Sequence, residues 1–404
     1  MAYIQRDLTS KIKNLSKEYS CILITGARQV GKTTLLENSI DKNIKFVTLD
    51  DLSERQLAKT DPELFLNTHK TPIVIDEVQY APELFSYIKI AIDKGAVPGS
   101  FYLTGSQSFK LMKLVKESLA GRVAILELPT LSQGEILNIK NEEFKTEFES
   151  LENRLGEYTD VSGIYKRVFN GGLPALISGK YTDRDIYYSS YIKTFIERDV
   201  SDEINGIDKF LFSDFIRACA CRIANELNIH AIAKDVGISD DTAKRWLSVL
   251  EAAEIIFFIH PFSNNLLKRT VKNKKMYFFD TGIVAYLLKY SSSEILMNDA
   301  INGAILENFV VNELRKTYQN NCKEATFYYY RDVDGNEIDL IIDYDNVLHP
   351  IEIKKTSTPN EKMIKNFKCI DKSSRKRGRG CLICMKDKLT VIDRENTMVP
   401  VWLI

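Results

Sequence analysis

The sequence predicts an α/β protein in three parts: a parallel sheet covered by helices, a helical middle, and a small α/β unit at the C-terminal end. The sheet is predicted by short, continuous apolar runs that alternate with amphipathic stretches, a pattern typical of parallel strands buried on both faces. The apolar runs are residues 21–25, 44–49, 73–76, 101–104 and 125–128, and the stretches between them include residues 33–39, 61–67 and 84–94.

The length of 404 residues predicts about two or three domains. Residues 135–160 hold eight acidic side chains against three basic ones, and this polar segment marks the end of the first unit. We expect an N-terminal domain over residues 1–155, a helical connector or lid over 156–210, a winged-helix-like domain over 211–282 and a C-terminal domain over 283–404.

The composition is that of an ordinary globular protein, with 44% hydrophobic residues available for a core. Basic and acidic residues both number 55, so any nucleic acid or acidic lipid would have to meet a local patch. The seven cysteines are scattered and odd in number, which favours a reducing compartment over a disulfide framework. No run approaches the roughly 18 apolar residues of a membrane span, so we expect a soluble, cytoplasmic protein without a membrane partner.

A glycine-rich turn follows the first apolar run. Residues 26–33 read Gly-Ala-Arg-Gln-Val-Gly-Lys-Thr, which is the P-loop pattern between a strand and a helix. Glycines let successive backbone N–H groups face phosphate oxygens, while Lys32 brings a positive charge and the Thr33 hydroxyl a ligand for Mg²⁺. The residues expected to bind the nucleotide here are Gly26, Ala27, Arg28, Gln29, Val30, Gly31, Lys32, Thr33 and Thr34.

Two carboxylates end the run at residues 73–76. An apolar strand that ends in Asp76 places this carboxylate at the sheet edge beside the P-loop, where it can hold Mg²⁺. Glu77 is then placed to orient and deprotonate the attacking water. Residues 104–107 form a polar cluster after the next strand, and Ser106 in it is expected to contact the nucleotide; ordinary turn chemistry is the alternative interpretation.

These motifs resemble the AAA+ superfamily, in particular the bacterial and archaeal branch with a Walker B sequence of Asp-Glu-x-Gln, here residues 76–79. The resemblance implies ATP and Mg²⁺ as cofactors and a nucleotide sensor at residues 104–107. It also makes Arg122 a candidate arginine finger that acts across a subunit interface, which requires an oligomer, or in cis after domain closure. The alternative for Arg122 is a lone surface arginine. The resemblance continues through residues 171–174 and 191–200, in an accompanying domain of unknown function.

The middle of the chain has the plan of a winged helix. Helices are predicted over residues 211–226, 230–236 and 240–254, followed by a strand pair at 255–259 and 275–279. The third helix exposes a balanced set of charges, so the basic loop at residues 268–275 is the better candidate for contact with nucleic-acid phosphates. Docking of a protein partner by the winged helix is the alternative.

In the last 100 residues, the sequence predicts helices at residues 303–319 and 359–370. It predicts strands at residues 325–331, 337–343, 347–354, 381–385 and 389–393. Asp339 and Glu352 fall on neighbouring strands, and Lys354 shares a strand face with Glu352. This order resembles the PD-(D/E)XK nuclease core, with Glu307 at the helical acidic position. The resemblance implies a metal held by Asp339 and Glu352, with Lys354 as the catalytic lysine. An exposed strand of alternating charges is the alternative.

A basic run at residues 372–379 follows this constellation and is expected to give salt-sensitive, nonspecific affinity for nucleic acid. Together these features predict an ATPase whose nucleotide state controls a nuclease-like C-terminal domain that contacts nucleic acid. The alternative is a regulatory NTPase switch whose winged helix and catalytically silent tail bind protein partners.

Overall fold

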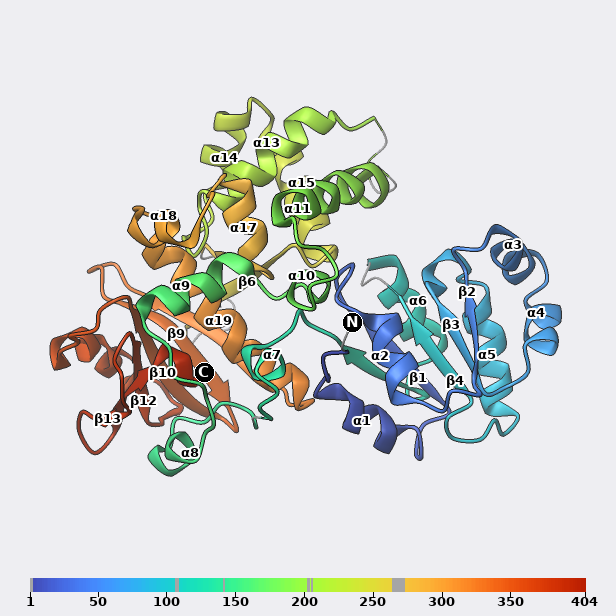
Figure 1. The fold of residues 1–404 in the computed structure, drawn as a ribbon, viewed down its shortest axis with the longest axis horizontal. Helices are drawn as coiled ribbons and strands as arrows, with labels where there is room; N and C mark the ends of the chain where they lie inside the picture. The colour runs from blue at the N-terminus through green and yellow to red at the C-terminus, as the bar shows by residue number, and fades with distance from the viewer. Residues whose placement is uncertain (1–2, 106–108, 141, 202–203, 205, 264–272) are drawn as a thin grey trace.

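The computed structural model describes residues 3–105, 109–140, 142–201, 204, 206–263 and 273–404. Two sheets lie on opposite sides of the molecule in Figure 1, the N-terminal one in blue and the C-terminal one in orange and red. Green helices lie above and between them. Among the helices described here, none is long and apolar enough to cross a membrane.

The N-terminal sheet confirms the predicted parallel arrangement. Its strands are β1 (Cys21–Thr25), β2 (Lys45–Thr48), β3 (Ile73–Asp76), β4 (Phe101–Thr104) and β5 (Val123–Glu127), in the order β2-β3-β4-β1-β5 with all neighbours parallel. Alternate residues of β1 enter different cores, with Leu23 on one face and Ile22 and Ile24 on the other. Both faces of the sheet are therefore covered, as the continuous apolar runs predict.

Helices surround this sheet. They are α1 (Leu8–Leu15), α2 (Lys32–Ser39), α3 (Leu52–Thr60), α4 (Pro62–Thr68), α5 (Leu84–Asp93) and α6 (Phe109–Ser118). Asp51 caps α3 by accepting hydrogen bonds from the backbone N–H groups of Ser53 and Glu54, and Asp61 caps α4 in the same way. These side chains satisfy backbone donors that have no partner inside the helix. Helices α1 and α3 were not predicted from the sequence.

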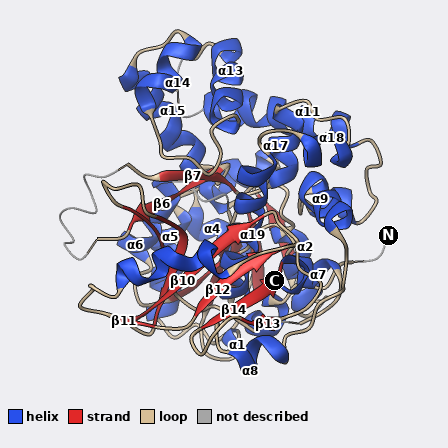
Figure 2. Ribbon diagram, turned by 90° about the vertical axis from the view of Figure 1, so that its left-hand side faces the viewer, coloured by secondary structure: helices blue, strands red, loops and turns tan. Residues whose placement is uncertain are grey.

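The middle of the chain is helical as predicted, with some boundaries shifted. It contains α7 (Gln133–Ile136), α8 (Phe148–Glu152), α9 (Val161–Asn170), α10 (Pro174–Ile177), α11 (Arg184–Thr194), a π-helical turn (Phe195–Val200), α13 (Lys209–Ala220), α14 (Ile229–Val236) and α15 (Asp240–Ala252). The helix predicted at residues 211–226 is shorter than expected: α13 ends at Ala220, and Ala224, with φ 58°, donates a backbone hydrogen bond to Met276. Helices α13, α14 and α15 lie together at one end of the molecule, away from β10 and β12 (Figure 2).

The C-terminal sheet is mixed. Its strands are β6 (Ile256–Pro261), β7 (Lys275–Phe278), β8 (Thr326–Arg331), β9 (Glu337–Tyr344), β10 (Val347–Lys354), β11 (Lys376–Arg377), β12 (Gly380–Cys384), β13 (Thr390–Val391) and β14 (Asn396–Pro400). The order is β13-β14-β12-β10-β9-β8-β6-β7, with β11 beside β10. Strand β14 was not predicted, and the helix expected at residues 359–370 is a 3-10 helix (Glu361–Ile370).

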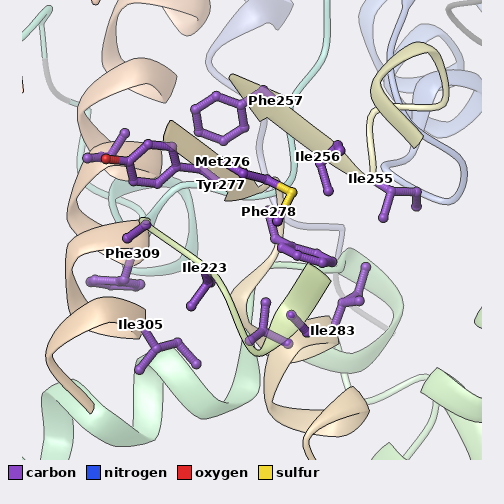
Figure 3. Packing of buried hydrophobic residues seen from close by; sticks show 14 of the residues in the cluster. Ile223, Ile255, Ile256, Phe257, Met276, Tyr277, Phe278, Ile283, Ile305 and Phe309 are labelled. Carbon is purple, nitrogen blue, oxygen red and sulfur yellow. The ribbon is translucent and has the colours of Figure 1, made fainter. Parts of the chain in front are cut away.

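Strand β6 belongs to two structural units. It pairs antiparallel with β7, as in the predicted strand pair, and parallel with β8 of the C-terminal sheet. Helices α17 (Thr281–Leu287), α18 (Ser293–Asn298) and α19 (Asn302–Asn320) follow β7, and α19 packs on the same core. Figure 3 shows Ile256 and Phe278 of the strand pair in one cluster with Ile305 and Phe309 of α19. The sheet and its core thus continue across the boundary expected at residues 282 and 283.

Helix α19 also joins the C-terminal unit to the N-terminal one. Glu313 accepts a hydrogen bond of 2.8 Å from the backbone N–H of Gln133, and Lys316 donates one of 2.9 Å to the carbonyl of Leu131. One helical turn further on, the Gln319 side chain donates to Glu127 at the end of β5 at 2.6 Å. One rigid helix therefore contacts both the end of the N-terminal sheet and the core of the C-terminal one.

Candidate functional site

The glycine-rich turn connects β1 to α2, at the carboxyl edge of the N-terminal sheet. Gly26 has φ 145° and Gly31 has φ 93°, conformations that favour glycine. A Cβ atom on Gly26 would lie 2.4 Å from the carbonyl oxygen of Leu128, so no larger residue fits without a backbone shift. The turn therefore approaches β5 closely while its backbone curls at the start of α2.

Lys32, the first residue of α2, is only 7% exposed. Its ammonium donates hydrogen bonds of 2.8 and 2.9 Å to the carbonyl oxygens of Gly26 and Ala27, in its own loop. Burial lowers the pKa of Lys32, against the opposing effect of the carboxylates of Glu77, Glu254 and Asp76. The ammonium is thus held in a buried, acidic environment at the turn.

Side chains from helix α2 and from the ends of the neighbouring strands β3 and β4 meet beside Lys32. The Thr33 hydroxyl donates to Asp76 Oδ1 at 2.8 Å, and the Thr104 hydroxyl donates to the same oxygen. The backbone N–H of Glu77 in turn donates to the Thr104 hydroxyl at 3.1 Å, and the Gln79 side chain donates to the Glu77 carboxylate. Adjacent parallel strands end at the same edge, so the residues that follow them come together, as predicted for 33, 76, 77 and 104.

The hydroxyl of Thr33 and the carboxylate of Asp76 are oxygen ligands of the kind that Mg²⁺ prefers. Mg²⁺ in nucleotide sites keeps water molecules and phosphate oxygens, so it needs few protein ligands. Among the residues that the structure describes, no three acidic, histidine or cysteine side chains form a group that could hold a metal ion by themselves. The pair at Thr33 and Asp76 fits an ion that is bound together with a phosphate ligand.

A cavity of about 890 Å³ opens beside the same turn. Gln29, Val30, Gly31 and Thr34 of the turn line one side, and the Tyr187 hydroxyl of α11 donates a hydrogen bond to the Gln29 side chain. The remaining walls are largely aromatic and aliphatic and include Tyr3, Ile4, Pro174, Tyr181 and Ile186. Its size and mostly apolar lining suit a flat organic group next to the phosphate-binding turn.

This cavity could not be predicted from the sequence. Its walls come from the N-terminal segment, the P-loop and helices α10 and α11, which lie far apart in the chain. The aromatic residues of α11 were a visible signal, but regular spacing on a helix is also what core packing requires. Ser106, expected at the nucleotide, lies outside the described residues.

Arg122 lies at the other end of the sheet. It immediately precedes β5, and its guanidinium binds both carboxylate oxygens of Asp93, at 2.6 and 3.3 Å. The P-loop is at the carboxyl end of the neighbouring strand β1, and a strand of this length spans roughly 15 Å at about 3.3 Å per residue. Arg122 therefore does not contact its own nucleotide site in this conformation, and the cis contact is not formed.

The acidic residues of the C-terminal sheet converge. With Leu340 opposite Ile351, the antiparallel pair β9 and β10 brings Asp339 beside Glu352. Lys354 contacts both carboxylates, at 3.2 Å from Asp339 and 2.6 Å from Glu352. Asp339 also accepts the backbone N–H of Ile353 at 2.8 Å, while Glu352 Oε2 is buried without a hydrogen-bond partner. The expected convergence is thus observed, with the lysine bridging the two acids.

Burial dominates the electrostatics of this cluster. It raises the pKa of Glu352 to about 8, assisted by Asp339 and opposed by Lys354. Burial would lower the pKa of Lys354, but Asp339 and Glu352 outweigh it and raise that pKa. The cluster can therefore exchange a proton near neutral pH, and a cation that bound to Glu352 would displace that proton.

The carboxylate of Glu307 on α19 is bound to a lysine and a tyrosine, and not directed to the metal site expected at Asp339 and Glu352. Its Oε1 atom accepts hydrogen bonds from Lys275 at 3.1 Å and from the Tyr277 hydroxyl at 2.7 Å. Lys275 also pairs with Glu337 at 2.7 Å. Burial raises the pKa of Glu307 to about 7, against the effect of Lys275. Glu307 is thus a member of a buried ion-pair network next to the Asp339 cluster.

Several side chains of the two basic segments are held in ion pairs. Residues 268–272 lie outside the described residues, and Lys275, at 3% exposure, is buried in ion pairs and cannot meet a phosphate backbone. In the second segment, Arg375 pairs with Asp343, and Arg377 pairs with Asp371 and Glu395. Other members of that segment line a cavity of about 540 Å³, namely Lys376, Gly378 and Arg379, together with His349 and Arg394.

Three parts of the chain match known protein families. Residues 18–137 match the family described as an AAA domain. This part of the chain is an AAA-type P-loop ATPase domain. Residues 162–294 and 302–404 match two further families, each described as a domain of unknown function. The second boundary falls after the β6–β7 pair, which the middle family includes.

Proteins similar to this chain are found in bacteria and archaea. A protein of Mycobacterium tuberculosis described as uncharacterised is 29% identical, over 88% of this chain and 75% of its own length. An uncharacterised protein of Methanocaldococcus jannaschii is 27% identical, over 99% of this chain and 90% of its own length.

Solved structures give a weaker likeness. The Walker-type ATPase PABY2304 of Pyrococcus abyssi matches 71% of this chain and 96% of its own at 15% identity and a TM-score of 0.46. A RuvB variant of Thermotoga maritima matches 62% of this chain and 88% of its own at 19% identity and a TM-score of 0.31. Both TM-scores are below 0.5, too low to establish a shared fold.

Proposed function

We propose that the protein binds ATP with Mg²⁺ in the AAA-type domain and hydrolyses it. The observation that carries this proposal is the hydrogen-bonded group of Thr33, Asp76, Thr104 and Glu77 beside the buried Lys32. It joins a phosphate-binding turn to the carboxylates that hydrolysis requires.

The role of each residue follows from its position. Backbone N–H groups of residues 26–31 and the Lys32 ammonium bind the phosphates, and the adjacent cavity takes the base. Thr33 and Asp76 hold Mg²⁺, which when bound neutralises charge on the phosphate oxygens. Glu77 orients the attacking water, and Thr104 fixes the Glu77 backbone through its hydroxyl.

Replacing Lys32 with alanine tests the binding step. The variant is expected to lose ATP binding almost completely, because the buried ammonium is the cation nearest the phosphates. Isothermal titration with ATP and Mg²⁺ measures this loss, and Lys42→Ala, an exposed lysine of the same domain, is the control that should bind like the parental protein. Retained binding in Lys32→Ala would refute the assignment.

We further propose that Arg122 acts on the nucleotide of a neighbouring subunit. Arg122 lies at the end of the sheet opposite its own P-loop, where a second copy of the chain could approach it. Arg122→Ala is expected to lower ATP turnover under assembling conditions with little change in affinity, since such a contact forms mainly in the transition state. Unchanged turnover at a protein concentration that gives oligomers would leave Arg122 as a surface partner of Asp93.

For the C-terminal domain we propose a nuclease-like centre at Asp339, Glu352 and Lys354, controlled by the nucleotide state. The supporting observation is the buried Glu352 oxygen without a partner, next to a second carboxylate and a lysine. Asp339 and Glu352 would hold a divalent cation, and the cavity lined by Lys376 and Arg379 would meet the phosphate backbone. Control of the C-terminal domain by the nucleotide state is supported by helix α19, because this helix contacts both β5 and the C-terminal core.

The bridging position of Lys354 favours a second candidate function, a regulatory NTPase switch with a silent tail. A lysine that holds both carboxylates already compensates their charge without a metal ion. In that case the exposed face of α15 and the C-terminal sheet would serve as docking surfaces for proteins. A search for cleavage separates the two candidates, as described in the Discussion.

A further inference from the structure

Arg6, in the segment before α1, is a buried cation that contacts the P-loop. It is 3% exposed, and its guanidinium donates hydrogen bonds to three separate parts of the N-terminal domain. Nε donates to a carboxylate oxygen of Glu135 at 2.9 Å, Nη1 to the carbonyl oxygen of Val30 at 2.8 Å and Nη2 to that of Pro129 at 2.7 Å. A guanidinium presents its donors in a rigid, planar fork, so Arg6 fixes these three acceptors relative to one another.

The bond to Val30 orients one peptide unit of the P-loop. The peptide bond between Val30 and Gly31 is trans, and in a planar trans peptide the C=O and N–H groups point in opposite directions. Because Arg6 holds the carbonyl, the N–H of Gly31 is directed away from Arg6, and within the described part of the chain no acceptor is bound to it. Free N–H groups at the start of a helix are what a P-loop offers to phosphate oxygens. Arg6 therefore acts on a phosphate-binding donor through the backbone.

The other anchors of Arg6 are fixed in turn. Glu135 forms a capping box with Ser132 at the start of α7, in which its second carboxylate oxygen accepts the Ser132 N–H at 3.0 Å. Helix α19 holds the same segment through hydrogen bonds of Glu313 and Lys316 to its backbone. A positioning side chain is precise only where its own supports are rigid. The supports of Arg6 meet this condition.

From these contacts we propose that Arg6 is a positioning residue of the ATP site, which sets the P-loop in the conformation that accepts phosphate. The inference rests on the proposed function and adds a residue to that site. With Arg6 in place the loop is ready before ATP arrives, so no binding free energy is lost in reorganising it. Without its guanidinium only a fraction of the molecules hold the loop in this conformation, and the apparent Kd rises by the inverse of that fraction.

Replacing Arg6 with lysine in the full chain tests this role. Lysine keeps a positive charge beside Glu135 but lacks the planar fork, so it cannot also hold both Val30 and Pro129. The affinity for ATP with Mg²⁺ is expected to fall by roughly 10- to 100-fold, the value of one hydrogen bond to a charged group. Isothermal titration measures the change, and Lys13→Ala, at an exposed site of α1, is the control that should bind like the parental protein.

Inorganic triphosphate with Mg²⁺ is the second probe, because it carries the phosphates without base or ribose. Its affinity is expected to fall by the same factor as that of ATP, since the oriented N–H serves the phosphates. Tyr3 and Ile4, close to Arg6 in sequence, line the adjacent cavity. A loss of affinity for ATP with unchanged affinity for triphosphate would place the role of Arg6 in the cavity wall and overturn the inference.

Steady-state kinetics give a third readout. In Arg6→Lys the KM for ATP is expected to rise while kcat changes little, because bound phosphate holds the loop in place once ATP saturates the site. A fall in kcat without a rise in KM would contradict positioning of the loop before binding.

Thermal unfolding shows whether Arg6→Lys is folded. The double variant Arg6→Met with Glu135→Gln covers the case in which it is not. This change removes both charges of the buried pair, so neither is left uncompensated, and methionine has no donor for the Val30 carbonyl. The same loss of affinity for ATP and triphosphate is expected.

The outcomes separate this inference from the ATP proposal. If the parental protein binds ATP and Lys32→Ala does not, but both Arg6 variants bind ATP like the parental protein, the positioning role is wrong and the ATP site stands. If the parental protein binds neither ATP nor triphosphate, the proposed ATP site itself fails, and this inference with it. Equal weakening of both ligands in a folded Arg6 variant supports the positioning role.

Discussion

Replacing Glu77 with glutamine is expected to lower ATP hydrolysis by roughly 100-fold or more while leaving ATP affinity unchanged. Glutamine keeps the size and most of the hydrogen bonding of this side chain, including a contact with Gln79. It cannot accept a proton from the attacking water, so the loss falls on the chemical step. Steady-state phosphate release and a binding titration measure the two quantities separately.

The fixed position of Glu77 is the structural reason to expect a large effect. Its backbone is held in a left-handed conformation, φ 57°, and its N–H is bound to the Thr104 hydroxyl. Strained residues of this kind occur at active sites, where the surrounding structure determines their position. Glu83→Gln, at an exposed site in the same domain, is the control. Hydrolysis by Glu77→Gln at the parental rate would mean that another group positions the water.

Replacing Asp339 with asparagine is expected to abolish nucleic-acid cleavage and to leave ATP hydrolysis intact. Asparagine keeps the hydrogen bond to Ile353 but removes the charge that a divalent cation and Lys354 require. Because Glu352 has a pKa of about 8, cleavage should increase as the pH rises through that value, where its carboxylate becomes free for a metal ion. Gel assays on DNA and RNA, with Mg²⁺ or Mn²⁺ and with or without ATP, measure both effects.

The control for this experiment is Asp334→Asn, an exposed residue in the loop before β9 that should cleave like the parental protein. Cleavage by Asp339→Asn at the parental rate would place the activity elsewhere or in a contaminant. Absence of cleavage by the parental protein on every substrate would favour the regulatory switch, in which Lys354 holds the two carboxylates permanently.

Features encoded by neighbouring residues could be predicted from the sequence. The P-loop and Asp76 each follow an apolar strand, so their place at one edge of a parallel sheet follows from topology alone. The meeting of Asp339 and Glu352 could likewise be predicted, because a short hairpin fixes the register of β9 and β10. Asp345 and Asn346 both adopt positive φ in that hairpin, as a tight turn requires.

Features that depend on distant segments could not be predicted. In the sequence, Glu254 is one of several acidic residues near the end of a helix. Its carboxylate comes near Lys32 only when the middle region folds onto the N-terminal domain. Lys275 reads as part of a basic loop, yet folding buries it between Glu307 and Glu337. Charge in a sequence does not tell whether a side chain is solvated or paired, because the partners come from other elements.

The strand shared by two units limits how this protein can be divided. A fragment that ended at residue 282 would keep β6 but lose β8, which would leave an unpaired strand edge and uncover the apolar side of Phe257 and Phe278. A fragment that began at residue 283 would lose Lys275, the cation that compensates Glu307 inside the remaining core. The regions that match the middle and C-terminal families therefore share one sheet and one core, so we expect neither region to fold without the other.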